Sequence, residues 1–228
     1  MDVSIIIPLF NESESLKELD DWISLSFKYK DLDYEVVYID DGSNDSSWDI
    51  IKSISQNNSN RKGISFIKNY GKSQALRVGF SEAKGKYIST LDADLQDSPE
   101  EIPLMIKKLT ENDLDLISGW KKKRHDSFIT KRIPSYFFNL VARVFSGINL
   151  NDFNCGIKVY RKEVAKSINL YADMHRFIPI LAKNQGFNRI GEHVVKHQAR
   201  KYGKTKFGNE RFIRGFLDII TLWFTEKF

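Results

Sequence analysis

Strand and helix signals alternate along the first 120 residues, and this alternation limits the folds open to the chain more than any other feature. Runs rich in Val, Ile, Phe and Tyr occur at residues 3–8, 34–40, 63–69, 86–92 and 114–120. Helical patterns lie between them at 13–29, 46–56, 73–83 and 99–109. Because strands that alternate with helices pair in parallel through right-handed crossovers, the pattern predicts an α/β fold with a doubly wound, mostly parallel sheet.

The pattern changes after residue 120. A basic stretch is followed by an aromatic-rich amphipathic helix at 133–147, a helix at 176–186 and a strand at 189–198. A basic, glycine-containing loop and an apolar-faced helix at 210–228 end the chain. Internal repeats and a Pro/Gly-rich linker are both absent from the sequence, so we expect one domain over residues 1–228 with an elaborated C-terminal third.

Composition narrows the class of partner. Cys155 is the single cysteine, so an intramolecular disulfide is excluded. The first ten residues have no basic region before their apolar run, and no run approaches ~18 apolar residues, so we expect neither a signal peptide nor a membrane-spanning helix. The formal net charge of +5 indicates an anionic partner: nucleic acid, a phosphorylated substrate or a membrane surface.

An acidic cluster follows the run at 86–92. On an extended strand Asp92 and Asp94 point to the same face, and with the amide oxygen of Gln96 they form a hard oxygen ligand set suited to Mg²⁺ or Mn²⁺. A plainer interpretation is that these residues only begin the next helix. Ser98 and Glu101 have the spacing of a capping box, with Pro99 at the first helical position. That explains the end of the cluster but leaves Asp92 and Asp94 without a role.

Two earlier strand ends carry similar polar groups. Pro8 is expected to end the first strand, and Asn11 and Glu12 to start a helix. At the second strand end, Asp40 can accept a hydrogen bond from a ribose hydroxyl or a base N–H, and a turn begins at Asp41. Each is also typical of an ordinary strand-to-helix turn. Ligands of doubly wound sheets bind beyond the carboxyl ends of the strands, so we expect a nucleotide site here.

Taken in order, three strand ends read P-x-x-N-E at 8–12, D-D-G-S at 40–43 and D-A-D-L-Q at 92–96. With "NYGKSQALRVGFSEAKGKYISTLDADLQDSPEEIP", "MHRFIPILA" and "RKYGKTKFG", this set resembles the family-2 glycosyltransferases of the GT-A fold. The resemblance covers nearly the full chain. It is to the branch that contains dolichyl-phosphate mannose synthase and the bacterial polyprenyl-phosphate glycosyltransferases.

The resemblance implies roles for individual residues. Positions around the base and ribose correspond to Pro8, Asn11, Glu12 and Asp40, with Asp41 beside them. Asp92 matches the first Asp of the D-x-D motif near ribose and diphosphate, Asp94 and Gln96 match the metal-binding positions, and Lys72 fits a nucleotide-proximal loop. Asp152 falls in a segment similar to the family's acceptor-side D-x-x-x-G. The implied division is a nucleotide-sugar half at 1–120, an acceptor-side half at 121–209 and a membrane-proximal helix at 210–228.

The chain also departs from the mannose synthases. It reads Asn154-Cys155 where they have small hydroxyl residues, and its basic stretch after residue 120 differs, so the identity of the sugar does not transfer. Most individual lysines of such a stretch are expected on a solvated face. Arg200 and Lys204 stand beside glycines that permit a mobile loop, and we expect them to clamp a diphosphate or an acceptor phosphate.

These features together predict a metal-dependent inverting glycosyltransferase. It would use Mg²⁺ or Mn²⁺ to move a sugar from a nucleotide sugar, UDP in preference to GDP, onto a polyprenyl phosphate for cell-surface glycan assembly. We expect it in the cytoplasm at the inner membrane face, through the apolar helix at 210–228, although packing of that helix on the domain explains its pattern equally well. Nucleic acid is not an expected partner, and the sequence leaves homo-oligomers open.

Two alternatives stay open. One is an enzyme of the same fold that acts on a glycan hydroxyl, for which Asp152 would be the general base. The other is a basic nucleotide- or nucleic-acid-binding module without catalysis, with aromatic residues among the basic ones available for base stacking. That module would leave the carboxylates at the strand ends without a function.

Overall fold

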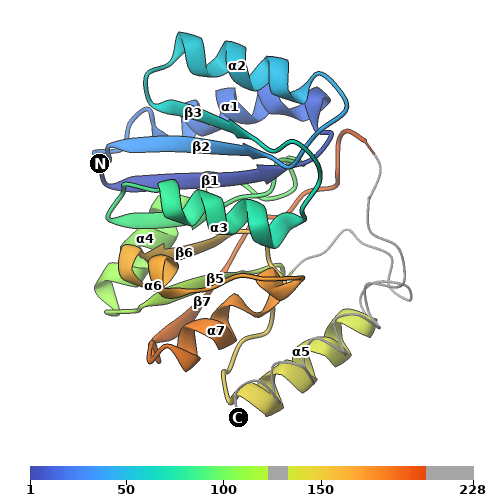
Figure 1. The fold of residues 1–228 in the computed structure, drawn as a ribbon. Helices are drawn as coiled ribbons and strands as arrows, with labels where there is room; N and C mark the ends of the chain where they lie inside the picture. Colours follow the sequence, from blue (N-terminus) through green and yellow to red (C-terminus); the bar gives the residue numbers. More distant parts are fainter. Residues whose placement is uncertain (123–132, 204–228) are drawn as a thin grey trace.

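A seven-stranded sheet forms the centre of the molecule (Figure 1). The structure is a computed structural model, and it describes residues 1–122 and 133–203. The sheet has the order β3-β2-β1-β4-β6-β5-β7. In chain order the strands are β1 Val3–Leu9, β2 Tyr34–Asp40, β3 Arg61–Ser65, β4 Tyr87–Thr90, β5 Leu116–Trp120, β6 Lys158–Arg161 and β7 Ile190–Val194. The predicted strands are therefore present, and the mostly parallel sheet is confirmed.

Strand β6 is the one strand of the sheet that the sequence did not predict. It lies between β4 and β5 and runs antiparallel to both, so β5 is not the direct neighbour of β4. Ser89 Oγ donates a hydrogen bond to the Lys158 carbonyl at 3.1 Å and Thr90 Oγ1 donates to the Gly156 carbonyl at 2.8 Å. Because β6 is only four residues long and buried on both faces, it has no alternating polarity for a sequence pattern to detect.

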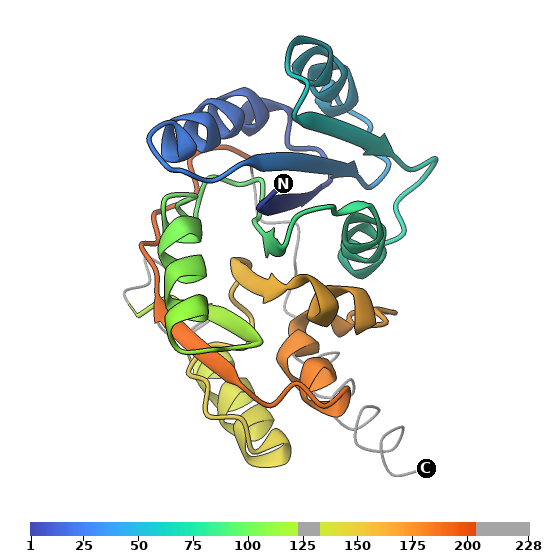
Figure 2. The same ribbon diagram turned by 90° about the vertical axis from the view of Figure 1, so that its left-hand side faces the viewer.

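Helices cover both faces of the sheet (Figure 2). One face packs against α1 (Ser13–Phe27), α2 (Ser47–Asn57) and α4 (Glu101–Glu111). The other packs against α3 (Lys72–Glu82), α5 (Ile133–Ser146), α6 (Lys162–Ser167) and α7 (Ile178–Asn184), which follows the 3₁₀ turn η2 (Met174–Phe177). Adjacent residues of β1 enter opposite layers: Ile5 and Ile7 face α1, and Ile6 faces α3. Both layers exclude water, which explains why these strands are almost continuously apolar.

Two local predictions were wrong. Strand β1 continues through Pro8 to Leu9. The Ile6 carbonyl accepts a hydrogen bond from Leu91 N, so this side of β1 faces β4. The nitrogen of Pro8, two residues later, points to the same side. Strand β4 has already ended at Thr90, so the missing N–H of Pro8 costs the sheet no hydrogen bond. The capping box also does not form, because Ser98 Oγ accepts from Glu100 N at 3.3 Å and the Glu101 carboxylate turns toward β7. It lies 3.1 Å from His193 Nε2 and accepts from Lys196 N at 3.3 Å.

Asp115, just before β5, predicts a pH dependence of folding stability. Burial would raise its pKa, but hydrogen bonds from Arg189 outweigh this and lower it. Its ionised form therefore stabilises the fold above the ordinary carboxyl pKa of about 4, and this contribution is lost as pH falls through the lowered folded value. Because Arg189 is half exposed, we expect Asp115→Asn to cost about 1 kcal/mol at pH 7. The difference from the unaltered chain should shrink toward pH 3 in urea titrations; a difference independent of pH would contradict this.

Candidate functional site

The first part of the site lies where β1 and β2 end. Their register places Leu9 beside Asp40, so the two following turns meet. Ser43 Oγ accepts from Asn11 N at 2.8 Å, and Asn11 Oδ1 accepts from Asn44 N at 2.8 Å. Asn11 adopts a left-handed φ of 53°, which Asn tolerates better than most residues. The interlocked turns fix the approach to Glu12, whose backbone N–H donates to Ser47 Oγ at 3.0 Å.

Asp40 and Asp41 have different surroundings. Asp40 accepts hydrogen bonds from Ser43 N at 3.0 Å and from Ser65 Oγ at 3.3 Å. The two oxygens of Asp41 accept from Tyr70 N at 2.7 Å and Gly71 N at 2.9 Å, directly before α3. Burial raises the pKa of Asp41 despite these bonds. Asp41 therefore fixes the start of α3, the helix whose first residue is Lys72.

The acidic cluster lies past its strand rather than on it. Strand β4 ends at Thr90, and Leu95 has a left-handed φ of 60°, so the extended-strand argument does not apply to Asp92 and Asp94. The alternation nevertheless persists in burial: Asp92, Asp94 and Gln96 are partly exposed, and the residues between them are buried. The turn thus leaves these three side chains partly exposed, although the segment is not an extended strand.

Each carboxylate of the turn is paired with a cation from a distant part of the chain. Asp92 forms an ion pair with Lys72, at the start of α3. Arg200 Nη2 lies 2.7 Å from Asp94 Oδ2, and Arg200 Nη1 lies 3.4 Å from Glu12 Oε1. The sequence separations of 20 and 106 residues mean that the fold, not local pairing, assembles these contacts.

The electrostatics of Asp92 and Asp94 differ although they are neighbours. Burial would raise the pKa of Asp92, but the Lys72 ammonium outweighs it and the pKa falls. Burial raises the pKa of Asp94, the negative charge of Asp92 raises it further, and Arg200 opposes both only in part. The ionised form of Asp94 is therefore less stabilised than that of Asp92, and a bound cation would stabilise it further.

Asp97 belongs to a buried arrangement that the sequence did not predict. It lies 2.9 Å from Lys121 Nζ and 3.2 Å from His197 Nδ1. Lys121 is only 15% exposed, so it differs from the solvated position expected of most lysines in its stretch. Burial would lower its pKa, but Asp97 outweighs this and raises it. Its position directly after β5 is the signal that could have identified it, because strand ends form the site.

The loop that leads into β6 packs against the acidic turn. A Cβ on Gly156 would lie 2.4 Å from Asp92 Oδ2, so only glycine allows this approach. Asp152 is 1% exposed, and its Oδ1 accepts from Asn154 N at 3.1 Å. Lys158, on β6, is buried as well; its ammonium donates to the Cys155 carbonyl, and burial lowers its pKa. Sequence patterns gave no indication of Lys158, because it lies on the unpredicted strand.

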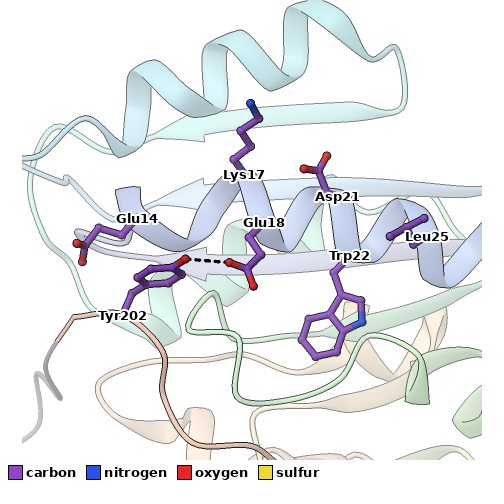
Figure 3. Close-up of a pocket in the computed structure, with 7 residues that line it drawn as sticks. All are labelled: Glu14, Lys17, Glu18, Asp21, Trp22, Leu25 and Tyr202. Carbon is purple, nitrogen blue, oxygen red and sulfur yellow. Dashed lines mark hydrogen bonds between the residues drawn. The ribbon is translucent and has the colours of Figure 1, made fainter.

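Residues 201 and 202 fasten the Arg200 segment to α1. Lys201 Nζ lies 2.8 and 2.7 Å from the two oxygens of Glu18, and Tyr202 OH donates to Glu18 Oε2 at 3.0 Å. Figure 3 shows Tyr202 beside α1 with its hydroxyl directed at Glu18; both residues line a pocket along this helix. We call the three residues Glu18, Lys201 and Tyr202 the α1 latch. Lys204 and the helix expected at 210–228 lie outside the described residues.

A divalent cation at this turn would need hard oxygen donors. Within residues 1–122 and 133–203, no group of three His, Cys, Asp or Glu side chains could hold a metal ion by itself. Asp94 and Gln96 offer a carboxylate and an amide oxygen, and both side chains are partly exposed. These residues fit a hard cation that takes its other ligands from phosphate oxygens and water, as Mg²⁺ commonly does.

Comparisons with known proteins agree with the fold. The family model for glycosyl transferase family 2 matches residues 4–168. Dodecaprenyl-phosphate galacturonate synthase of Rhizobium johnstonii is 33% identical over 230 residues, covering 100% of this chain and 68% of that protein. Undecaprenyl-phosphate 4-deoxy-4-formamido-L-arabinose transferase of Shewanella sediminis is 38% identical over 221 residues, covering 96% and 66%. The chain thus spans about two thirds of the length of these relatives.

Solved structures show the same architecture. Glucosyl-3-phosphoglycerate synthase of Mycobacterium tuberculosis, solved with uridine diphosphate, superposes with a TM-score of 0.71 at 18% identity, covering 96% of this chain and 79% of that one. Another structure of that protein holds Mn²⁺, UDP-glucose and phosphoglyceric acid, with a TM-score of 0.70. At this identity the likeness shows the fold, and the GT-A fold expected from the sequence is confirmed. The match over residues 4–168 and the 33% identity to the galacturonate synthase over this whole chain place the chain in glycosyl transferase family 2.

Proposed function

We propose that this chain is an inverting, divalent-cation-dependent glycosyltransferase that moves a sugar from a nucleotide sugar to a polyprenyl phosphate. The observation that carries the proposal is the pairing of Asp92 with Lys72 and of Asp94 with Arg200 at the carboxyl edge of the sheet. In this arrangement the cationic side chains can contact the oxygens of a diphosphate directly, and the carboxylates can contact them through a metal ion. The names of the relatives, which include dodecaprenyl and undecaprenyl phosphate, support the lipid acceptor.

The donor would occupy the edge where β1, β2 and β4 end. In this proposal Pro8, Asn11, Glu12 and Asp40 surround the base and ribose, and Asp92 lies toward the ribose and diphosphate. UDP is preferred over GDP. Asp41 would contribute indirectly, through the backbone of residues 70 and 71 that it holds. Lys72 and Arg200 already lie against the carboxylates and would turn to the phosphate oxygens.

Asp94 and Gln96 would hold Mg²⁺ or Mn²⁺. Such a cation, when bound, neutralises the negative charge that develops on the departing nucleoside diphosphate. Arg200 adds positive charge at the same edge, and with Lys204 it would enclose the diphosphate. The residues of the chain thus orient the leaving group and stabilise its charge, which are the main requirements of this reaction.

A phosphate acceptor needs no general base. A phosphate oxygen of a polyprenyl phosphate is ionised at neutral pH and can attack the anomeric carbon directly, and a single displacement inverts that centre. The acceptor requires cations for positioning, which the segment at 121–132 supplies in its sequence. The burial of Asp152 supports this acceptor over a glycan hydroxyl, for which Asp152 would have to reach the substrate as a base.

One assay tests the proposal and its alternatives. The chain is incubated with UDP- and GDP-sugars, Mg²⁺ or Mn²⁺ and a short-chain polyprenyl phosphate, and lipid-linked sugar is measured. Transfer that EDTA abolishes supports the proposal. Transfer only to a glycan would refute it in favour of the hydroxyl acceptor. Salt-sensitive oligonucleotide binding without cation-dependent binding of a nucleotide sugar would indicate the non-catalytic module.

The place of action follows from the acceptor. Among the residues that the structure describes, no helix is long and apolar enough to cross a membrane. We propose that the chain acts in the cytoplasm at the inner face of the membrane, where nucleotide sugars and a lipid carrier meet. Fractionation of cells that express the natural protein would test this location.

The α1 latch gives a prediction for the donor site. Glu18→Gln removes the charge that holds Lys201 and Tyr202, so Arg200 loses part of its support. Because the latch is solvent-exposed, we expect a modest effect: KM for the nucleotide sugar rises roughly threefold with little change in kcat. Glu14→Gln, the same charge change one turn earlier on α1, is the matched control. Equal KM values for the two variants would show that the latch does not position Arg200.

A further inference from the structure

The segment that carries Arg200 pairs directly with the acidic turn at residues 92–97. Asp97 and His197 form an isolated antiparallel bridge, although they lie 100 residues apart in the sequence. His197 Nδ1 also lies 3.2 Å from Asp97 Oδ1, and both side chains are buried. The turn that holds the proposed metal ligands is therefore joined to the segment that holds the proposed phosphate ligand.

Gln198 extends this pairing to the middle of the turn. Its backbone N–H donates to the Gln96 carbonyl at 2.9 Å, and its side-chain Nε2 donates to the Leu95 carbonyl at 2.7 Å. Leu95 has a left-handed φ of 60°, which is unfavourable for a residue that carries a Cβ. Such a conformation persists only where surrounding contacts hold it. The bond from Gln198 and the burial of the Leu95 side chain are two such contacts.

The part of the turn that Gln198 holds orients both proposed metal ligands. Gln96 N donates to Asp94 Oδ1 at 3.2 Å, and Gln96 Nε2 donates to the Gln198 carbonyl at 3.4 Å. The amide oxygen of Gln96 takes no part in the second bond, so it can face a cation. Arg200, two residues after Gln198, meets the other oxygen of Asp94 at 2.7 Å. A shift of the turn at Leu95 would therefore disturb the carboxylate, the amide and the guanidinium together.

We propose that Gln198 is a positioning residue for binding of the divalent cation and the nucleoside diphosphate. The inference rests on the proposed function, because it takes Asp94 and Gln96 as the metal ligands. Gln198 is exposed, and it acts through the turn and not by contact with the substrate. On one side it fixes the two carbonyls of the turn, and on the other it fixes the backbone from which Arg200 extends.

Binding of UDP and Mn²⁺ by Gln198→Met tests the proposal. Methionine is close to glutamine in length but has no N–H, so the substitution removes the bond to Leu95 and keeps the backbone bond to Gln96. In calorimetric titrations of the full chain, we expect the affinity for UDP in the presence of Mn²⁺ to fall roughly fivefold, the typical effect of one hydrogen bond. The Mn²⁺ concentration for half-maximal sugar transfer should rise by a similar factor, and kcat at saturating Mn²⁺ and donor should stay within about twofold. The thermal midpoint should stay within about two degrees, because the altered side chain is exposed.

The matched control is Gln56→Met, the same substitution at an exposed position of α2, which should bind UDP and Mn²⁺ as the unaltered chain does. Equal affinities for the two variants overturn the inference and leave the proposed function intact. A thermal midpoint that falls by many degrees in Gln198→Met alone also overturns it, because the role of Gln198 would then be structural. Failure of the unaltered chain to bind UDP in a Mn²⁺-dependent manner overturns the inference and the proposed metal site together. Transfer to a glycan and not to a lipid would refute only the proposed acceptor, since the inference concerns the donor side.

Discussion

Replacement of Asp94 by asparagine is expected to reduce sugar transfer by roughly a hundredfold or more. The substitution keeps the size and the polar character of the side chain but removes the negative charge that would hold the cation and that now meets Arg200 at 2.7 Å. Initial rates with saturating nucleotide sugar and polyprenyl phosphate, measured across a range of Mn²⁺ concentrations, give the size of the loss. We also expect Mn²⁺ to promote binding of the nucleoside diphosphate to the unaltered chain and not to Asp94→Asn.

The control for Asp94→Asn is Glu100→Gln. Glu100 is exposed and lies six residues after Asp94, and its substitution by Gln removes the same charge. Its rate should stay within about twofold of the unaltered chain, because exposed charges contribute little. The thermal midpoint of Asp94→Asn should change by only a few degrees, since the substitution also removes repulsion from Asp92. A variant that keeps half of its activity with unchanged Mn²⁺ dependence would exclude Asp94 as a metal ligand.

The sequence predicted the elements of the nucleotide-binding half because their signals are local. β1 and β2 are seven-residue strands with few polar side chains, and the helices between strands begin and end within a few residues of the predicted bounds. Ser13–Phe27 was expected at 13–29 and Lys72–Glu82 at 73–83. Such patterns depend on neighbours within one or two turns, so a single sequence contains them.

The cation partners could not be predicted in the same way. Lys72 was identified through the family resemblance and Arg200 through its glycine-rich loop, but neither route gives the carboxylate that each one meets. Lys121 lies in a basic run whose lysines are mostly expected in solvent, whereas in space it pairs with Asp97. Those contacts depend on the position of β6 between β4 and β5. A four-residue buried strand has no alternating pattern from which its place in the sheet could be predicted.

The second large effect concerns stability and a buried ion pair that has no part in the proposed chemistry. Arg61 is the first residue of β3, and its Nε lies 2.6 Å from Oδ1 of Asp20 on α1. Arg61 Nη2 donates to Ser24 Oγ at 2.6 Å, and Tyr38 OH donates to Asp20 Oδ1 at 2.7 Å. Burial would lower the pKa of Arg61, but the effect of the Asp20 carboxylate is larger and the pKa is raised. Burial, together with the Asp20 carboxylate, also raises the pKa of Tyr38, which therefore remains a donor.

Arg61→Met is expected to lower the free energy of unfolding by about 3–5 kcal/mol. The cost comes less from the lost attraction than from Asp20, which would stay buried with its charge uncompensated although Tyr38 still donates to it. The measurement is urea unfolding at pH 7, followed by tryptophan fluorescence, with the free energy extrapolated to water. Lys62→Met is the matched control, because the adjacent Lys62 pairs with Glu82 at the surface and should cost under about 1 kcal/mol.

A double variant separates the two origins of this loss. If the uncompensated charge of Asp20 dominates, Asp20→Asn combined with Arg61→Met should recover a large part of the stability, since a neutral amide can be buried with Tyr38 and Ser24 nearby. The guanidinium carbon of Arg61 lies 5.2 Å from the ring centroid of Tyr34. If the loss of this packing dominates, the double variant should be no more stable than Arg61→Met. A loss below about 1 kcal/mol for Arg61→Met alone would mean that water reaches Asp20 in the folded chain, and the pair would then be a surface contact in energetic terms.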